Sequence, residues 1–161
     1  MKCNILGSGS RRSLFNPDSL TSVGCNIPYA TVEYTVLFDT EIVDVLPCQV
    51  EYKLLVHKRV FSYLKNSRPH LLAKVDKVFE YSTSGYKLSS GHHAANCMIK
   101  KGYTELNLYG MDAWFEPKNW ENSYTDKYIA KKPGPLEMGR AWRDGWQLMM
   151  KQNPSVKFNF I

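Results

Sequence analysis

Short apolar runs alternate with helical patterns along most of the chain. The runs 2–6, 22–26 and 34–38 end in turn residues or an acid, which is typical of central strands in a parallel sheet. Four further runs, at 52–57, 74–83, 105–110 and 156–160, also predict strands. We expect the last of these at an edge of the sheet.

Four segments between these strands carry apolar residues at helical spacing. They predict a short helix within 38–47, stopped by Pro47, and longer helices at 58–66, from Ser89 or Ser90 to Gly102, and at 137–151. The third is the clearest, because a serine can cap its start and Gly102 stands where a C-cap glycine belongs. The alternation predicts one α/β domain over residues 1–161, with a mostly parallel sheet and helices on both faces.

The segment 116–135 is polar, aromatic and basic and ends in KKPGP. We therefore expect an extended loop or lid there. The side chains that could close on a phosphate or stack a base are Tyr124, Lys127, Tyr128, Lys131 and Lys132. A solvated surface loop is the more common outcome for such a stretch, and both interpretations stay open.

The charge of the chain favours anionic partners. Its formal net charge is +6 and its pI is near 9.1, in a composition of ordinary globular type with 43% hydrophobic residues. The basic residues are spread along the chain rather than gathered in a run. We therefore expect a small anionic ligand and rank nucleic acid below it.

The cysteine pattern argues against a metal site. Cys3, Cys25, Cys48 and Cys97 lie far apart, and none forms a CxxC pair or stands at zinc spacing with histidine. We expect no metal and no resident cofactor.

The sequence has no signal-peptide pattern and no apolar stretch long enough for a membrane span, so we expect a cytoplasmic protein without a membrane partner. Assembly into a homo-oligomer stays open.

Ligands of open parallel sheets bind beyond the carboxyl ends of the strands. That rule singles out the loop formed by Gly7, Ser8, Gly9 and Ser10, then Asn26, Asp39 and the segment 110–114. The glycine-serine loop suits a phosphate because its N–H groups can converge on an anion, and Arg11 and Arg12 favour that interpretation over a plain turn. Asp39 and Asp112 can each bind a ribose or cap a helix.

The start of the clearest helix is the second candidate anion site. Ser89, Ser90 and Gly91 open this helix, where free N–H groups and the helix dipole favour a negative ligand. His92 and His93 follow and are the candidate catalytic bases. Adjacent side chains on a helix point about 100° apart, so we expect at most one of these rings to face the ligand. The alternative is a capped helix with a surface histidine.

Several of these segments, in this order, resemble a known Rossmann-like group. They are ILGSGSRRSLFNPDSL, SVGCNIPYA, YTVLFDTEI and LSSGHHAANCMIKKGYTELNLYGMDAWF. The group joins bacterial CMP-sialic-acid sialyltransferases with MptE-like pterin pyrophosphokinases and motility-associated glycosyltransferase-like proteins. The resemblance covers roughly residues 3–46 and 88–115.

The resemblance implies a nucleotide-binding pocket at the strand ends. It places residues 7–10 against phosphate or ribose, Asn26 against the nucleotide, residues 89–91 around base or phosphate, and Asp112 near sugar or base. Two positions depart from the group. The first loop reads Ser-Gly-Ser-Arg where the group has asparagine followed by Gly-Pro-Ser, and no histidine follows His93.

Two classes of function follow. In the first, the protein binds a nucleotide or nucleotide-derived anion without turning it over, as a compact sequestering protein of the kind that phages encode. In the second, it is a nucleotide-dependent transferase of glycosyl or phosphoryl groups, with His92 or His93 as the base. The missing downstream histidine and the short chain favour binding, because a catalyst needs a positioned base and room for an acceptor.

Overall fold

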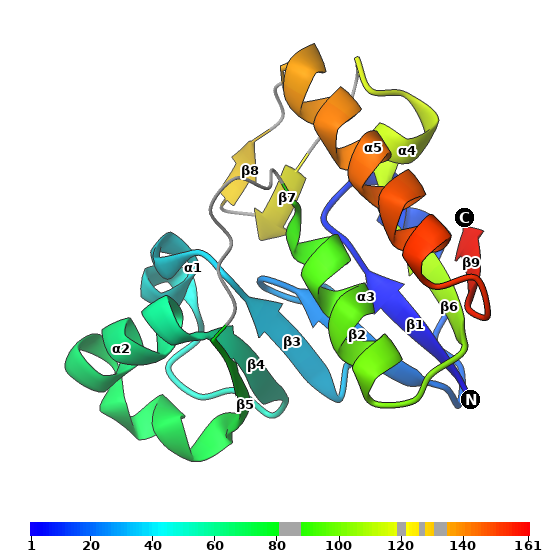
Figure 1. The fold of residues 1–161 in the computed structure, drawn as a ribbon. Helices are drawn as coiled ribbons and strands as arrows, with labels where there is room; N and C mark the ends of the chain where they lie inside the picture. Colours follow the sequence, from blue (N-terminus) through cyan, green and yellow to red (C-terminus); the bar gives the residue numbers. More distant parts are fainter. Residues whose placement is uncertain (81–87, 119–121, 126–127, 131–134) are drawn as a thin grey trace.

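The computed structural model describes residues 1–80, 88–118, 122–125, 128–130 and 135–161, with side chains described outside 119–134. Seven strands form one sheet in the order β5-β4-β3-β2-β1-β6-β9, and every neighbouring pair is parallel (Figure 1). The strands are β1 Lys2–Leu6, β2 Thr21–Cys25, β3 Tyr34–Leu37, β4 Lys53–His57, β5 Val75–Phe79, β6 Glu105–Tyr109 and β9 Lys157–Phe160. This confirms the predicted parallel α/β fold, with β9 at an edge.

Helices cover both faces of the sheet and form two buried cores. The helices are α1 Thr40–Val45, α2 Lys58–Ser67, α3 Ser90–Lys100, α4 Asp112–Phe115 and α5 Leu136–Gln152, with 3-10 turns η1 Ser10–Leu14 and η2 Pro69–Lys74. One core joins α3 and α5 to the sheet, and the other joins α1, α2 and η2 to it. Adjacent residues of β3 show the division, because Val36 enters the first core and Leu37 the second. Among the described residues, every helix is too short or too polar to cross a bilayer.

The helix α3 matches its prediction closely. Ser89 is its N-cap, and Gly102, just beyond its end, has a φ of +95° that favours glycine. Its buried alanines, Ala94 and Ala95, are fully enclosed by the first core. The small side chains let α3 approach β1, β2 and β3 closely. The first turn of α3 lies at the carboxyl edge of the sheet (Figure 1).

The segment 116–135 differs from the expected loop. It contains two antiparallel strands, β7 Asn122–Thr125 and β8 Tyr128–Ala130, which form a separate two-stranded sheet. The lid candidates Lys127, Lys131 and Lys132 lie outside the described residues, and the side chains of Tyr124 and Tyr128 are not described.

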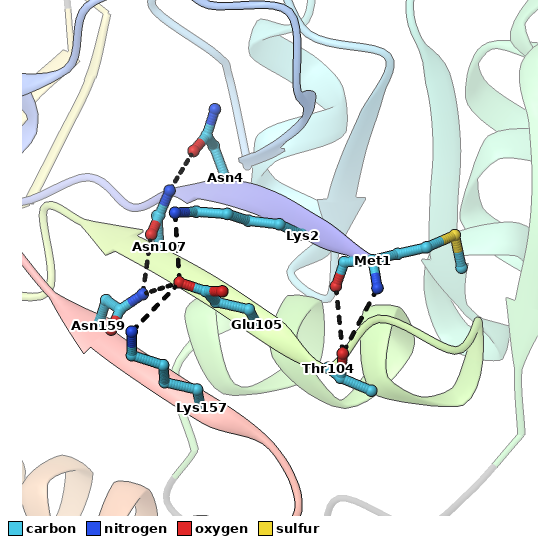
Figure 2. A network of polar contacts seen from close by, with 8 residues as sticks. All are labelled: Met1, Lys2, Asn4, Thr104, Glu105, Asn107, Lys157 and Asn159. Carbon is cyan, nitrogen blue, oxygen red and sulfur yellow. Dashed lines mark hydrogen bonds and ion pairs between the residues drawn. The ribbon is translucent and has the colours of Figure 1, made fainter.

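A row of asparagines crosses three strands on the face opposite α3 (Figure 2). Asn4 of β1, Asn107 of β6 and Asn159 of β9 stand in register. Asn159 donates to the Oδ1 of Asn107 at 3.1 Å, and Asn107 donates to the Oδ1 of Asn4 at 3.0 Å. Asn4 and Asn107 are buried, and their mutual bonds offset the cost of placing amides inside a parallel sheet.

The row ends on the segment that covers this face. Asn4 donates to the Asp18 carboxylate at 2.9 Å, and Phe15 packs edge-on against Tyr109 at 5.2 Å. At the other end, Asn159 also donates to Glu105, which Lys2 and Lys157 approach at 3.2 and 3.5 Å (Figure 2). Residues 10–20, which include η1, therefore cover this part of the face. The helices α1 and α2 cover the part of the same face that β3 and β4 form.

Candidate functional site

The strand order places a topological switch between β1 and β6. Strands β2 to β5 extend from β1 in one direction, whereas β6 and β9 lie on its other side. In open parallel sheets, the crevice at such a point is the usual ligand position. The predicted first loop follows β1, and Asp112 follows β6, so the fold brings these two candidates together.

The first loop donates hydrogen bonds to a carboxylate of the protein itself, that of Asp112. The Asp112 carboxylate accepts hydrogen bonds from the Ser10 N–H at 2.7 Å, the Ser10 hydroxyl at 2.6 Å and the Arg11 N–H at 3.1 Å. The Gly7 and Gly9 N–H groups donate to the carbonyl oxygens of Tyr109 and Gly110. We call Gly7, Gly9, Ser10, Arg11 and Asp112 the switch-point group.

Close packing also fills the space above the switch. A Cβ atom on Gly9 would lie 2.5 Å from the Gly110 carbonyl oxygen, so only glycine fits there. The Met111 side chain packs against both Gly7 and Gly91, where added Cβ atoms would meet its Sδ at 3.0 and 2.7 Å. Ser8 is nearly buried beside them. The usual ligand position is therefore filled from within.

The two arginines after the loop lie on aromatic rings. The Arg11 guanidinium is 3.8 Å from the centre of the Phe115 ring, and its Nε donates to the Ile161 carbonyl oxygen at 3.3 Å. The Arg12 guanidinium lies 4.8 Å from the centre of the Tyr29 ring. Both contacts stabilise the loop through cation–π attraction.

His92 links α3 to α5. Its Nδ1 accepts from the Ser89 N–H at 3.0 Å, so its Nε2 carries the hydrogen and donates to the Trp142 carbonyl oxygen at 2.9 Å. The ring is fully buried and stacks on Trp146 at 4.1 Å. Burial lowers its pKa to about 3. These contacts give His92 a structural role between two helices.

His93 turns toward the strand ends instead. Its ring stacks on Phe38 with centres 3.7 Å apart, and Phe38 also packs against His57 at 5.4 Å. Burial, together with the nearby His57 and Arg59, lowers the pKa of His93 to about 4. The two adjacent rings thus have different partners, as the helical geometry predicted.

His57 and Arg59 are the site residues that the sequence reasoning missed. His57 ends β4 and caps α2, where its Nδ1 accepts from the N–H and the Nε of Arg59, each at 3.3 Å. The strand-end rule that singled out Asn26 and Asp39 applies equally to His57. We call Asp39, His57, Arg59 and His93, which lie around the end of β4, the β4-end group.

Asn26 has the most unusual backbone of the described residues. Its φ of 63° is the only positive value at a described residue other than glycine. The Thr35 hydroxyl donates to its carbonyl oxygen at 2.6 Å, and its N–H donates to the Val36 carbonyl oxygen at 3.0 Å. Such a conformation costs free energy, so neighbouring contacts must hold it.

The Asn26 side chain meets the first turn of α3. Its Oδ1 accepts from the Ser90 hydroxyl at 3.4 Å, and its amide nitrogen has no hydrogen-bond partner among the described residues, although the residue is only 4% exposed. Ser90 and Gly91 are the first helical residues, whose N–H groups have no intrahelical acceptor. We call Asn26, Ser90 and Gly91 the α3-end group.

Most of the predicted site residues therefore lie in three neighbouring groups along one edge of the sheet. The Asp112 carboxylate accepts from the N–H groups of the switch-point group, whereas the α3-end group presents donors. Within the described residues, no three His, Cys, Asp or Glu side chains are arranged to hold a metal ion. Comparisons with protein-family models, curated proteins and solved structures found no match to this chain.

Proposed function

We propose that the protein binds a nucleotide or nucleotide-derived anion at the α3-end group and holds it without turning it over. The observation that carries the proposal is Asn26, a residue only 4% exposed that contacts the first turn of α3. Its amide nitrogen and the N–H groups of Ser90 and Gly91 have no hydrogen-bond partner among the described residues. Three neutral donors at a helix N-terminus suit a phosphate or carboxylate oxygen. The net charge of +6 supports attraction of such a ligand.

The histidines favour binding over catalysis. His92 uses both ring nitrogens in structural hydrogen bonds, and burial keeps it neutral. This leaves His93 as the single candidate base of the original pair. The His93 ring stacks on Phe38 at the strand ends, near the proposed ligand. This position is the observation that favours the alternative proposal, a nucleotide-dependent transferase.

Native mass spectrometry of the protein purified from its own cells tests the proposal. We expect a bound nucleotide at one per chain, released with its mass unchanged after denaturation in the presence or absence of candidate acceptors. The same preparation of His93→Gln is the control for turnover. Release of a chemically altered nucleotide from the wild type, but an intact one from His93→Gln, would establish the transferase instead.

A further inference from the structure

The backbone of Asn26 is held by a buried hydroxyl group of the neighbouring strand β3. We propose that Thr35 is a positioning residue for the ligand: its hydroxyl fixes Asn26 in the left-handed conformation and so holds the amide nitrogen of Asn26 at the first turn of α3 before a ligand binds. This inference rests on the proposed function, because it explains how the α3-end group is organised for the anionic part of a nucleotide.

Asn26 turns the chain sharply at the end of β2. The strand ends at Cys25, and Asn26 follows it with a φ of 63°. The chain then folds back onto β2, where a Cβ atom on Gly24 would lie 2.8 Å from the Cβ of Pro28. A left-handed conformation costs free energy for every residue except glycine, so this turn needs contacts that hold it.

Thr35 supplies one of these contacts from β3. It stands in register with Gly24 of β2, and it is completely buried. Its hydroxyl donates to the Asn26 carbonyl oxygen at 2.6 Å, and within the described part of the chain this is the one hydrogen bond that the oxygen accepts. The Asn26 N–H donates to the Val36 carbonyl oxygen at 3.0 Å. Both backbone groups of Asn26 are therefore bonded to β3.

Fixing the backbone also sets the direction of the Asn26 side chain. The Oδ1 of Asn26 accepts from the Ser90 hydroxyl at 3.4 Å, while the amide nitrogen has no partner among the described residues. The residue is buried, so its side chain has little room to rotate. A donor that already points to the ligand position needs no rearrangement on binding, which raises the affinity.

Loss of the Thr35 hydroxyl should therefore weaken binding through Asn26. Thr35→Val removes the hydroxyl and keeps a branched side chain that suits a strand. Asn26 then relaxes toward the conformations that asparagine prefers, and the ligand must restore the left-handed one. We expect the affinity to fall about fivefold or more. Thr35→Ser keeps the hydroxyl and should bind within about twofold of the wild type.

The test is calorimetric titration with the ribonucleoside 5′-mono-, di- and triphosphates of adenine, guanine, cytosine and uracil, after thermal unfolding has shown that each protein is folded. The best-bound nucleotide is then titrated into Thr35→Val, Thr35→Ala and Thr35→Ser, and into Asn26→Gly with and without Thr35→Val. Glycine accepts a positive φ without support, so in the Asn26→Gly protein Thr35→Val should change the affinity by less than about twofold.

A threonine at the other end of β2 gives the matched control. Thr21 is the first residue of β2, and its hydroxyl donates to the Glu33 carboxylate at 3.1 Å. Thr21→Val removes the same chemical group from the opposite edge of the sheet, and we expect the affinity of the wild type. A residue that only stabilised the fold would lower the affinity equally with Asn26 or glycine at position 26.

The outcomes separate this inference from the proposed function. If Thr35→Val and Thr35→Ala bind the nucleotide as tightly as the wild type, or if Thr35→Val weakens the wild type and Asn26→Gly by the same factor, Thr35 does not position Asn26, and nucleotide binding stands. Failure of both hydroxyl-free variants to fold also overturns the inference, because it assigns the hydroxyl to the fold alone. If the wild type binds none of these nucleotides, both the inference and the proposed function are wrong.

Discussion

At the residue scale, His92 and His93 show how one helical step separates two roles. His92 packs against Trp146 and bonds to Trp142 of α5, whereas His93 stacks on Phe38 at the strand ends. Both are neutral and buried, so both resist protonation in the folded state. The sequence showed that the two rings must diverge, but the partner of each lies far along the chain.

The two histidines should make stability fall in acid. Their folded-state pKa values of about 3 and about 4 lie below the ordinary 6.5. As the pH falls through 6.5, the unfolded chain binds protons that the folded protein does not. The stabilisation is therefore complete above pH 6.5 and decreases toward pH 4, by up to about 1.4 kcal/mol per pH unit for each histidine.

Urea denaturation at pH 7 and pH 5 measures this effect. We expect the free energy of unfolding to be lower at pH 5 by roughly 3 to 4 kcal/mol from the pair. His93→Phe keeps a ring against Phe38 but removes one titrating group, so it should lose about half of this pH dependence. Equal stability of the wild type at both pH values would contradict the assignment of these pKa values.

At the element scale, the apolar runs located all seven strands of the main sheet because each strand is a short segment that carries apolar residues and is bounded by polar or turn residues. The elements that escaped prediction have weaker signals. α4 has only four residues, and β7 and β8 lie in a polar stretch. Burial of Asn4 and Asn107 was also unexpected, since it depends on the register of β1 with β6 and β9 rather than on any local pattern.

The asparagine row should act as one unit. Asn107→Val removes the donor to Asn4 and one acceptor of Asn159, leaving the Oδ1 of the buried Asn4 without this partner (Figure 2). We expect a loss of about 2 to 3 kcal/mol in the free energy of unfolding. The double variant Asn4→Val with Asn107→Val should cost at least about 1 kcal/mol less than the sum of the single changes.

Thermal and urea unfolding of the wild type, both single variants and the double variant complete this cycle. Tyr63→Phe is a control, because it removes an exposed hydroxyl that donates to Asp44 and should leave stability nearly unchanged. Strict additivity of the two asparagine changes would show that the amides do not stabilise one another.

At the scale of the whole molecule, sheet order decides which strand-end residues can act together. The strand-end rule identified Gly7, Asn26, Asp39 and Asp112 from the sequence, but it could not show that Asp112 accepts the N–H groups of Ser10 and Arg11, about a hundred residues earlier in the chain. Because Asp112 accepts these bonds, we place the proposed ligand at the ends of β2, β3 and β4 rather than at the switch-point group. His57 and Arg59 lie at the end of β4 and were not predicted as site residues.

Nucleotide binding by Asn26 and the first turn of α3 can be tested at Asn26 itself. Asn26→Gly is the suitable variant, because glycine accepts the positive φ while the amide is removed. The measurement is calorimetric titration of wild type and Asn26→Gly with ribonucleoside mono-, di- and triphosphates, after thermal unfolding has shown that both are folded. We expect saturable binding of at least one nucleotide, at one per chain, and an affinity about tenfold or more lower in the variant. Equal affinity of the two proteins, or no saturable binding to the wild type, would contradict it.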